Sequence, residues 1–199
     1  MRTMVPLDAM AKKVCITSEN ARIGHAHDLA SRKPRLLDLF CCAGGAGVGY
    51  SRAGFEVVGV DNKPQSNYPL PFIQADALKL DPEFIASFDA IHASPPCQSY
   101  SDLAKRNGNA HEWPRLIEPV REILIASGLP YVIENVDGAP LLNPMVLCGT
   151  MFKGLRVLRH RLFETNFKLR FLYYFTKRFS LCQRRKSCLG QKREGSVSF

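Results

Sequence analysis

Short apolar segments alternate with stretches of helical spacing between residues 35 and 135, and this alternation constrains the fold of the chain more than any other feature. Apolar runs of six or seven residues separated by turns and short helical segments are typical of βαβ units, whose strands are parallel and buried. Such runs cover residues 35–40, 55–61, 71–76, 88–94 and 129–135. The pattern predicts a single α/β domain with a doubly wound, mostly parallel sheet and helices on both faces.

Helical segments are expected between these strands over residues 47–54, 82–87 and 114–127. The third segment has apolar residues at helical spacing, and Gly128 is placed to end it. Pro114 suits the first turn of this helix, whereas Pro119 either kinks the helix or delays its start.

A glycine-rich loop, DLFCCAGGAGVGY over residues 38–50, follows the first expected strand. Glycine lets the backbone approach a ligand closely, and ligands of parallel sheets bind at the carboxyl ends of the strands. The second strand ends at Asp61, 23 residues after Asp38, a spacing that suits an acid accepting hydrogen bonds from ribose hydroxyls. The arrangement indicates a Rossmann-like site for an adenosine-containing cofactor. The glycines do not match G-x-G-x-x-G cleanly, although this loop alone leaves a dehydrogenase open.

Asp76, in QADAL, ends the third expected strand and is a second acidic candidate. At the carboxyl edge of the sheet it could accept a hydrogen bond from the amino group of an adenine ring. Aspartate is equally typical of a helix N-cap, so the residue alone does not separate a binding role from a structural one.

The segment ASPPCQSYS, residues 93–101, is the most informative for chemistry. Its two prolines fix the backbone just beyond the fourth strand and present Cys97 at the carboxyl edge of the sheet. A free thiol there is placed to act as a nucleophile, although it needs help to form the thiolate. The fifth strand ends in IENV, so Glu134 reaches the same edge and could donate a proton to a ring nitrogen.

Arg159 and Arg161, in RHRLFE, have alternating spacing, so on a strand their side chains would share one face. Two arginines on one face suit a phosphate or a carbonyl oxygen. They suit a solvated edge equally well, and the pattern leaves both open.

The formal net charge of +9 points to a polyanionic partner, and most of it lies at one end of the chain. Residues 168–199 contain nine of the 27 lysines and arginines and one of the 18 acidic residues, so this tail carries +8 and the preceding residues +1. No segment approaches the length of a membrane span, and no export signal is visible. We expect the seven cysteines to be free thiols without a metal site, in a monomeric protein that is cytoplasmic or associated with the nucleoid.

Five motifs occur in one order along the chain: residues 38–45 (DLFCCAGG), 60–61 (VD), 95–98 (PPCQ), 134–136 (ENV) and 159–161 (RHR). Together they resemble the C5-cytosine DNA methyltransferases over residues 35–167. The resemblance implies S-adenosylmethionine as the methyl donor and DNA as the acceptor, in a setting such as restriction–modification, and it leaves RNA open as the acceptor. Cys97 would attack C6 of cytosine, and Glu134 would protonate N3. Arg161, with Arg159, would orient the base.

The resemblance also implies residues for S-adenosylmethionine, namely Phe40, Cys42, Gly44, Gly45, Asp61, Asp76 and Pro96. Phe40 would pack near the adenine or the sulfonium, and the two glycines would lie along the methionine portion. Asp61 would hold the ribose and Asp76 the adenine. Cys42 falls where the family usually has its first glycine, so we expect a substitution in the pocket rather than a metal ligand.

The chain departs from the family after the arginine motif. We expect a loosely ordered lead-in over residues 1–34, a methyltransferase domain over residues 35–167 and a disordered basic tail over residues 168–199. A target-recognition region is not recognisable in the tail, which suggests a truncated or frame-shifted coding sequence. A non-catalytic protein that binds nucleic acid through the tail is the alternative from another functional class.

Overall fold

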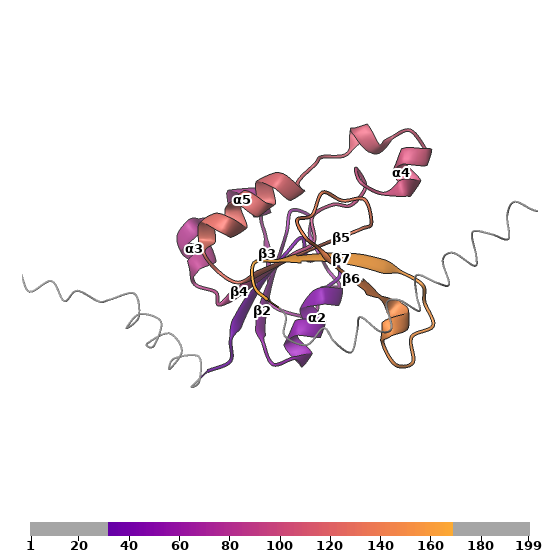
Figure 1. The fold of residues 1–199 in the computed structure, drawn as a ribbon. Coiled ribbons are helices and arrows are strands. Elements are labelled where there is room, and N and C mark those ends of the chain that lie inside the picture. Colours follow the sequence, from indigo (N-terminus) through magenta and orange to yellow (C-terminus); the bar gives the residue numbers. More distant parts are fainter. Residues whose placement is uncertain (1–31, 169–199) are drawn as a thin grey trace, which may run out of the picture. The chain divides into compact units, whose positions relative to one another are not determined.

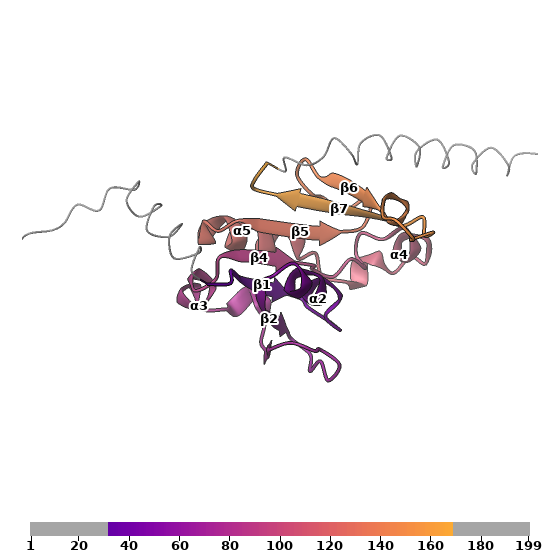
Figure 2. The same ribbon diagram turned by 90° about the horizontal axis from the view of Figure 1, so that it is seen from below.

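The structure of the protein is a computed structural model that describes residues 32–168. The described residues from Pro34 onward belong to one compact unit. One sheet of seven strands lies at its centre, in the order β3-β2-β1-β4-β5-β7-β6 (Figures 1 and 2). The strands are β1 (Arg35–Leu39), β2 (Glu56–Asp61), β3 (Phe72–Gln74), β4 (Ala90–Ala93), β5 (Tyr131–Asn135), β6 (Met145–Cys148) and β7 (His160–Thr165).

The first five strands pair in parallel with their neighbours, whereas β7 runs antiparallel to both β5 and β6. This arrangement confirms the predicted α/β class with a mostly parallel, doubly wound sheet. All five predicted strands are present, each with ends within two residues of the prediction. The prediction omitted β6 and β7, which close the sheet beyond β5.

The helices within residues 32–168 are α2 (Gly45–Arg52), α3 (Pro82–Ala86), α4 (Asp102–Arg106) and α5 (Ile117–Ser127), with 3₁₀ turns η1 (Ala77–Lys79), η2 (Ala110–Glu112) and η3 (Gly149–Met151). Both ribbon views place α2 on one face of the sheet and α3 and α5 on the opposite face (Figures 1 and 2). None of these helices is long and apolar enough to cross a lipid bilayer.

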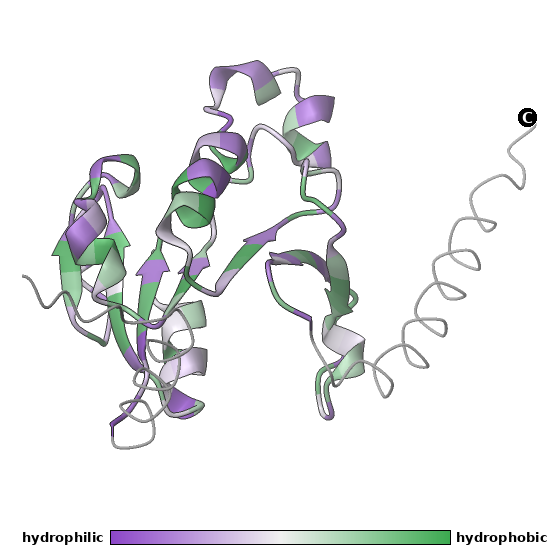
Figure 3. Cartoon of the chain, turned by 60° about the vertical axis from the view of Figure 1, so that its left-hand side comes forward, coloured by the Kyte–Doolittle hydropathy of each residue, from purple (hydrophilic) through white to green (hydrophobic). Residues whose placement is uncertain are grey.

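Helix α5 begins at Ile117, so the prediction that Pro114 lies in its first turn is wrong. Pro119 is the third residue of the helix, where a backbone N–H would have no intrahelical acceptor, and the missing donor costs nothing. Gly128 ends the helix in a left-handed conformation, as predicted. The helices carry both hydrophobic and hydrophilic residues (Figure 3), and the buried residues Val120 and Leu124 of α5 pack in the core against residues of the sheet.

The main core lies between the sheet and the face covered by α3 and α5. It is built from Leu37 and Leu39 of β1, Val60 of β2, Ile91 and Ala93 of β4, Tyr131 and Ile133 of β5, Val120 and Leu124 of α5, and Ala77, Ile85 and Phe88. Since burial of each large aliphatic side chain stabilises the fold by roughly 1.5–3 kcal/mol, this layer holds the strand ends in fixed positions.

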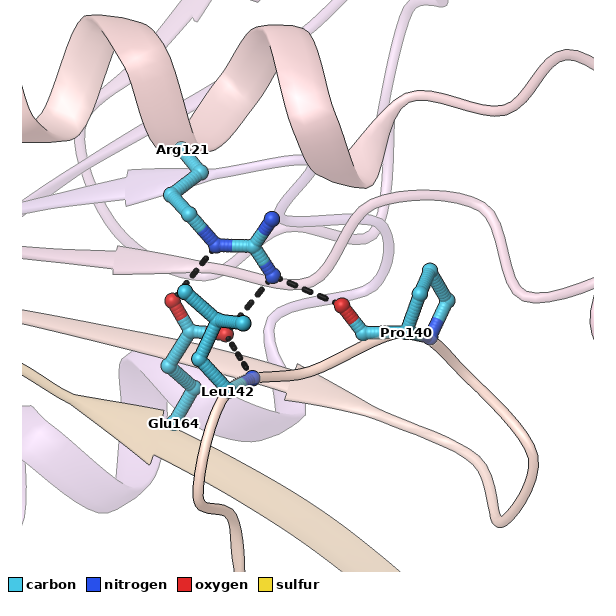
Figure 4. A network of polar contacts seen from close by, with 4 residues as sticks. All are labelled: Arg121, Pro140, Leu142 and Glu164. Carbon is cyan, nitrogen blue, oxygen red and sulfur yellow. Dashed lines mark hydrogen bonds and ion pairs between the residues drawn. The ribbon is translucent and has the colours of Figure 1, made fainter.

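A buried ion pair fixes β7 against α5 (Figure 4). Arg121 of α5 donates from Nε to Oε1 of Glu164 at 2.7 Å and from Nη2 to Oε2 at 2.8 Å. The same Nη2 donates to the carbonyl of Pro140, and the backbone N–H of Leu142 donates to Oε2 of Glu164. The loop after β5 is therefore tied to the same carboxylate as β7.

The predicted lead-in and basic tail lie outside the described residues, apart from residues 32–34 and 168. Their boundaries stay predictions.

Candidate active site

A cavity of about 330 Å³ opens at the carboxyl ends of β1, β2 and β4, and we call it the edge cavity. Its walls are formed by Phe40, Cys42, Asp61, Asn62, Lys63, Gln65, Ser94, Pro96, Gln98, Trp113, Pro114 and Leu116. Four of the residues predicted to bind the cofactor, Phe40, Cys42, Asp61 and Pro96, thus line one cavity.

Asp61 joins the glycine loop to the end of β2. Its buried carboxylate accepts the backbone N–H of Cys42 at 3.1 Å on Oδ2 and that of Lys63 at 3.0 Å on Oδ1. A carboxylate oxygen has two lone pairs, so each oxygen can accept a further hydrogen bond. Asp61 can therefore hold the loop and still has acceptor capacity beyond these two backbone contacts.

The loop turns through residues in the left-handed region, with φ of 58° at Phe40, 44° at Cys42 and 89° at Gly44. This conformation costs a residue with a side chain roughly 1–2 kcal/mol, which explains why a glycine suits the position of Cys42. The Cys42 thiol also hydrogen-bonds Asp61, and burial together with that carboxylate raises the pKa of the thiol. Cys42 is therefore a neutral thiol that occupies part of the acceptor capacity of Asp61.

Asp38 lies buried beneath the glycine loop. Its Oδ2 accepts hydrogen bonds from the Tyr68 hydroxyl, at 3.4 Å, and from the backbone of Gly47. Its Oδ1 has no hydrogen-bond partner within the described part of the chain. Burial raises the pKa of Asp38 from 3.8 to about 7. A Cβ atom at Gly47 would lie 2.8 Å from Oδ2, so glycine is required there.

Replacement of Asp38 by asparagine is expected to remove a pH dependence of stability. Between about pH 4 and pH 7 the folded protein retains a proton on Asp38 that the unfolded chain releases. The free energy of unfolding of the native protein therefore falls as pH rises through this window, by on the order of 4 kcal/mol. Urea unfolding across this range should show Asp38→Asn gaining stability relative to the native protein as pH rises.

Asp81→Asn is the matched control, because this exposed aspartate caps α3 and asparagine caps equally well. Its stability should follow that of the native protein at every pH. Parallel profiles for Asp38→Asn and the native protein would show that Asp38 is ionised in the fold.

Cys97 follows β4 in a loop held by the next strand. The buried side chain of Asn135 donates from Nδ2 to the carbonyl of Pro95 at 2.9 Å and accepts the backbone N–H of Val136 at Oδ1. The carbonyl of Cys97 accepts the backbone N–H groups of Tyr100 and Ser101, which start the turn into α4. Sequence reasoning assigned Asn135 no role, although a polar residue at the end of a buried strand is a signal for such an anchor.

Glu134 and Arg161 form an ion pair across neighbouring strands, with 2.7 Å between Arg161 Nε and Glu134 Oε1. Burial raises the pKa of Glu134 above its ordinary value, and Arg161, Ser94 and Arg159 oppose that rise. Arg159 immediately precedes β7 and is exposed, so it is not a strand residue, and the shared strand face with Arg161 stays a prediction. The pair itself agrees with the prediction that Glu134 and Arg161 act at one place.

A larger cavity of about 720 Å³, the α2 cavity, adjoins the same strand ends on the α2 face. It is lined by Gly45, Ala46, Gly49, Tyr50, Ala53, His92, Ser94, Glu134, Phe152 and Phe163. Ser94 lines both cavities, so it lies between the edge cavity and Glu134.

Three predicted cofactor residues, Asp76, Gly44 and Gly45, lie away from the walls of the edge cavity. Asp76 accepts the backbone N–H of Leu78 at 3.0 Å and caps η1, which is the structural role considered for it. Gly44 packs against Tyr68 and Pro69. Their roles toward a cofactor, and that of Gly45 in the α2 cavity, stay predictions.

Comparison with known proteins places this chain in a family. The family model of C-5 cytosine-specific DNA methylases matches residues 34–156, which end before Arg159. The chain is 32% identical over 119 residues to Type II methyltransferase M.HgiGI of Herpetosiphon aurantiacus, covering 54% of this chain and 94% of that protein. It is 30% identical over 112 residues to Type II methyltransferase M.FnuDI of Fusobacterium nucleatum, covering 52% of this chain but 33% of that protein.

A third relative, Type II methyltransferase M.AquIA of Picosynechococcus sp., is 32% identical over 123 residues, which cover 52% of this chain and 49% of that protein. Among solved structures, methyltransferase EhMeth of Entamoeba histolytica has a TM-score of 0.50 and 15% identity, covering 67% of this chain and 52% of that chain. At that identity the likeness concerns the fold alone. The family model spans more than half of the chain, from before β1 to beyond β6, and the chain belongs to the C-5 cytosine-specific DNA methylase family.

Proposed function

We propose that this protein transfers a methyl group from S-adenosylmethionine to C5 of cytosine in DNA through a covalent bond between Cys97 and C6 of the base. The observation that carries the proposal is the placement of Cys97 on an anchored loop after β4, at the strand edge where Glu134 and Arg161 form their pair. A nucleophile, a carboxyl with raised pKa and a fixed cation are the groups that this addition requires. Membership of the family supports the same reaction.

The edge cavity fits an adenosine-containing methyl donor. Asp61 offers acceptor capacity for ribose hydroxyls, part of which the Cys42 thiol occupies, and Phe40 offers an aromatic surface on the same wall. When bound, S-adenosylmethionine supplies an electrophilic methyl group on a sulfonium. Ser94, Pro96 and Gln98 line the same cavity, so the loop that carries Cys97 borders the donor.

Cys97, Glu134 and Arg161 each have a separate role in the proposed reaction. Cys97 as a thiolate forms a bond to C6, and the electron pair of the C5–C6 double bond moves toward C5. Glu134 donates its proton toward N3, which neutralises the charge that builds on the ring, and Arg161 holds the carboxyl in place. After C5 has received the methyl group, C5 loses its proton to solvent, the C5–C6 double bond re-forms as the Cys97 thiolate departs, and N3 returns its proton to Glu134.

Transfer of a labelled methyl group to duplex DNA, with RNA as competitor, tests this function. We expect the labelled methyl group to appear in DNA. An excess of RNA of the same base composition should not lower the amount of label in the DNA. Extrusion of the cytosine from the duplex costs a few kcal/mol, so single-stranded and mismatched sites should react at least as well. Label in RNA alone would assign the protein to RNA cytosine methylation, and label in neither would favour the non-catalytic alternative.

Replacement of Cys42 by glycine is expected to tighten binding of S-adenosylhomocysteine about tenfold in a calorimetric titration. The change removes the left-handed strain and the thiol hydrogen bond to Asp61, which returns acceptor capacity to the ribose. Ala43→Gly is the matched control, since Ala43 is exposed and outside the left-handed region. Asp61→Asn should abolish binding, and unchanged affinity in both Cys42→Gly and Asp61→Asn would place the donor elsewhere.

A further inference from the structure

Three polar side chains line up behind Glu134 on the α2 face of the sheet. The Tyr50 hydroxyl of α2 lies 3.1 Å from Nδ1 of His92 on β4. Nε2 of His92 lies 2.8 Å from the hydroxyl oxygen of Ser94, and Ser94 in turn hydrogen-bonds the Glu134 carboxyl. All four residues line the α2 cavity, so the contacts form one continuous chain along its wall.

While Glu134 is ionised, the chemistry of the four groups fixes which group donates and which accepts in each of these hydrogen bonds. A carboxylate only accepts, so the Ser94 hydroxyl donates to Glu134 and its oxygen accepts from Nε2–H of His92. Burial lowers the pKa of His92 to about 4, so the imidazole is neutral and Nδ1 is an acceptor. Tyr50, whose pKa burial raises to about 12, then donates its proton to Nδ1. Every donor points toward Glu134.

A buried histidine in a parallel strand is costly unless both ring nitrogens are bonded. His92 is 2% exposed and meets that condition only because Tyr50 and Ser94 flank it. A valine or leucine would serve the packing of β4 without that requirement. The surrounding wall is largely apolar, with Ala53, Phe152 and Phe163, and low polarity strengthens hydrogen bonds within it. The series of hydrogen bonds is therefore better explained by the group at its end, Glu134, than by packing.

We propose that Ser94, backed by His92 and Tyr50, is a positioning residue that, with Arg161, fixes the Glu134 carboxyl and stabilises it while its proton is on cytosine N3. The inference rests on the proposed function, in which Glu134 is the proton donor. When Glu134 takes back a proton, each hydrogen bond of the chain can reverse, since the serine and tyrosine hydroxyls and the neutral imidazole both donate and accept. The charged groups that act on Glu134 are Arg161 of β7 and the preceding Arg159.

The test follows the Glu134 carboxyl directly, by NMR titration of a protein that contains ¹³C-labelled glutamate, with Glu134→Gln to assign the signal. Ser94→Ala should raise the pKa of Glu134, because its carboxylate loses a donor, and Ser94→Thr should restore it by returning a hydroxyl. At about pH 8, ¹⁵N NMR should show His92 as the neutral Nε2–H tautomer. Ser87→Ala is the control, because it removes an exposed hydroxyl that donates to the backbone carbonyl of Phe84. It should leave the Glu134 and His92 signals unchanged.

These readouts need no turnover, so absence of methyl transfer would overturn the proposed function and leave the hydrogen-bonded chain to be judged separately. Where transfer is measurable, Ser94→Ala should lower kcat on the order of tenfold with KM for DNA unchanged. An unchanged Glu134 pKa in Ser94→Ala would overturn the inference. So would an Nδ1–H tautomer of His92, because Ser94 would then donate to His92 instead of Glu134.

Discussion

Replacement of Cys97 by serine is expected to abolish methyl transfer to cytosine, by roughly 10³-fold or more. A serine hydroxyl is far less acidic than a thiol, so it cannot supply the anion that adds to C6, and only binding and electrostatic effects remain. The substitution changes one atom in a loop fixed by Asn135 and by the turn into α4, so the fold should be retained. Initial rates with labelled S-adenosylmethionine and duplex DNA measure the loss.

The control is calorimetric titration of the same variant with S-adenosylhomocysteine, which should bind as it does to the native protein. This comparison separates loss of chemistry from loss of the cofactor site. Methyl transfer by Cys97→Ser at a rate within tenfold of the native rate would contradict the assignment of Cys97 as nucleophile.

Replacement of Arg121 by methionine is expected to lower the free energy of unfolding by about 3–5 kcal/mol. Arg121 and Glu164 are 11% and 3% exposed, so loss of the arginine leaves a buried carboxylate without its cation. The two remaining contacts, from the Leu142 backbone N–H and the Tyr131 hydroxyl, are uncharged and cannot neutralise that charge. Urea denaturation near neutral pH measures the change.

Two further variants make the explanation specific. Lys79→Met removes the cation of an exposed pair with Asp76, and it should cost less than about 1 kcal/mol. A double replacement, Arg121→Met with Glu164→Met, should be more stable than Arg121→Met alone, because it removes the unpaired charge. A double variant less stable than the single one would show that packing, not charge, accounts for the loss.

The parallel part of the sheet could be predicted because each strand is a compact apolar run. β6 and β7 could not, since MVLC is four residues long and HRLFET has two adjacent apolar residues between polar pairs, which is neither an apolar run nor an alternating pattern. Their pairing depends on β5 and on a buried carboxylate whose partner, Arg121, lies 43 residues earlier. Such a contact leaves no local signal in the sequence.

The site was predictable where function coincides with a strand end. Asp61 and Glu134 lie at the ends of recognisable strands and Cys97 follows one, and parallel strands bring their carboxyl ends to one edge. The residues that support them were not predictable, because hydrogen-bond partners are set by tertiary structure. His92 carried a signal, as a polar residue inside the apolar run FDAIHAS, but nothing local identifies Tyr50 or Ser94 as its partners.

Covalent trapping with duplex DNA that contains 5-fluorocytosine tests the central claim most directly. C5 of this base carries fluorine in place of hydrogen, so after methylation the bond between Cys97 and C6 cannot be released. We predict a protein–DNA adduct that forms only when S-adenosylmethionine is present, with the DNA attached to the peptide containing Cys97. An adduct on another residue, or none from a protein that binds both DNA and S-adenosylhomocysteine, would contradict the account.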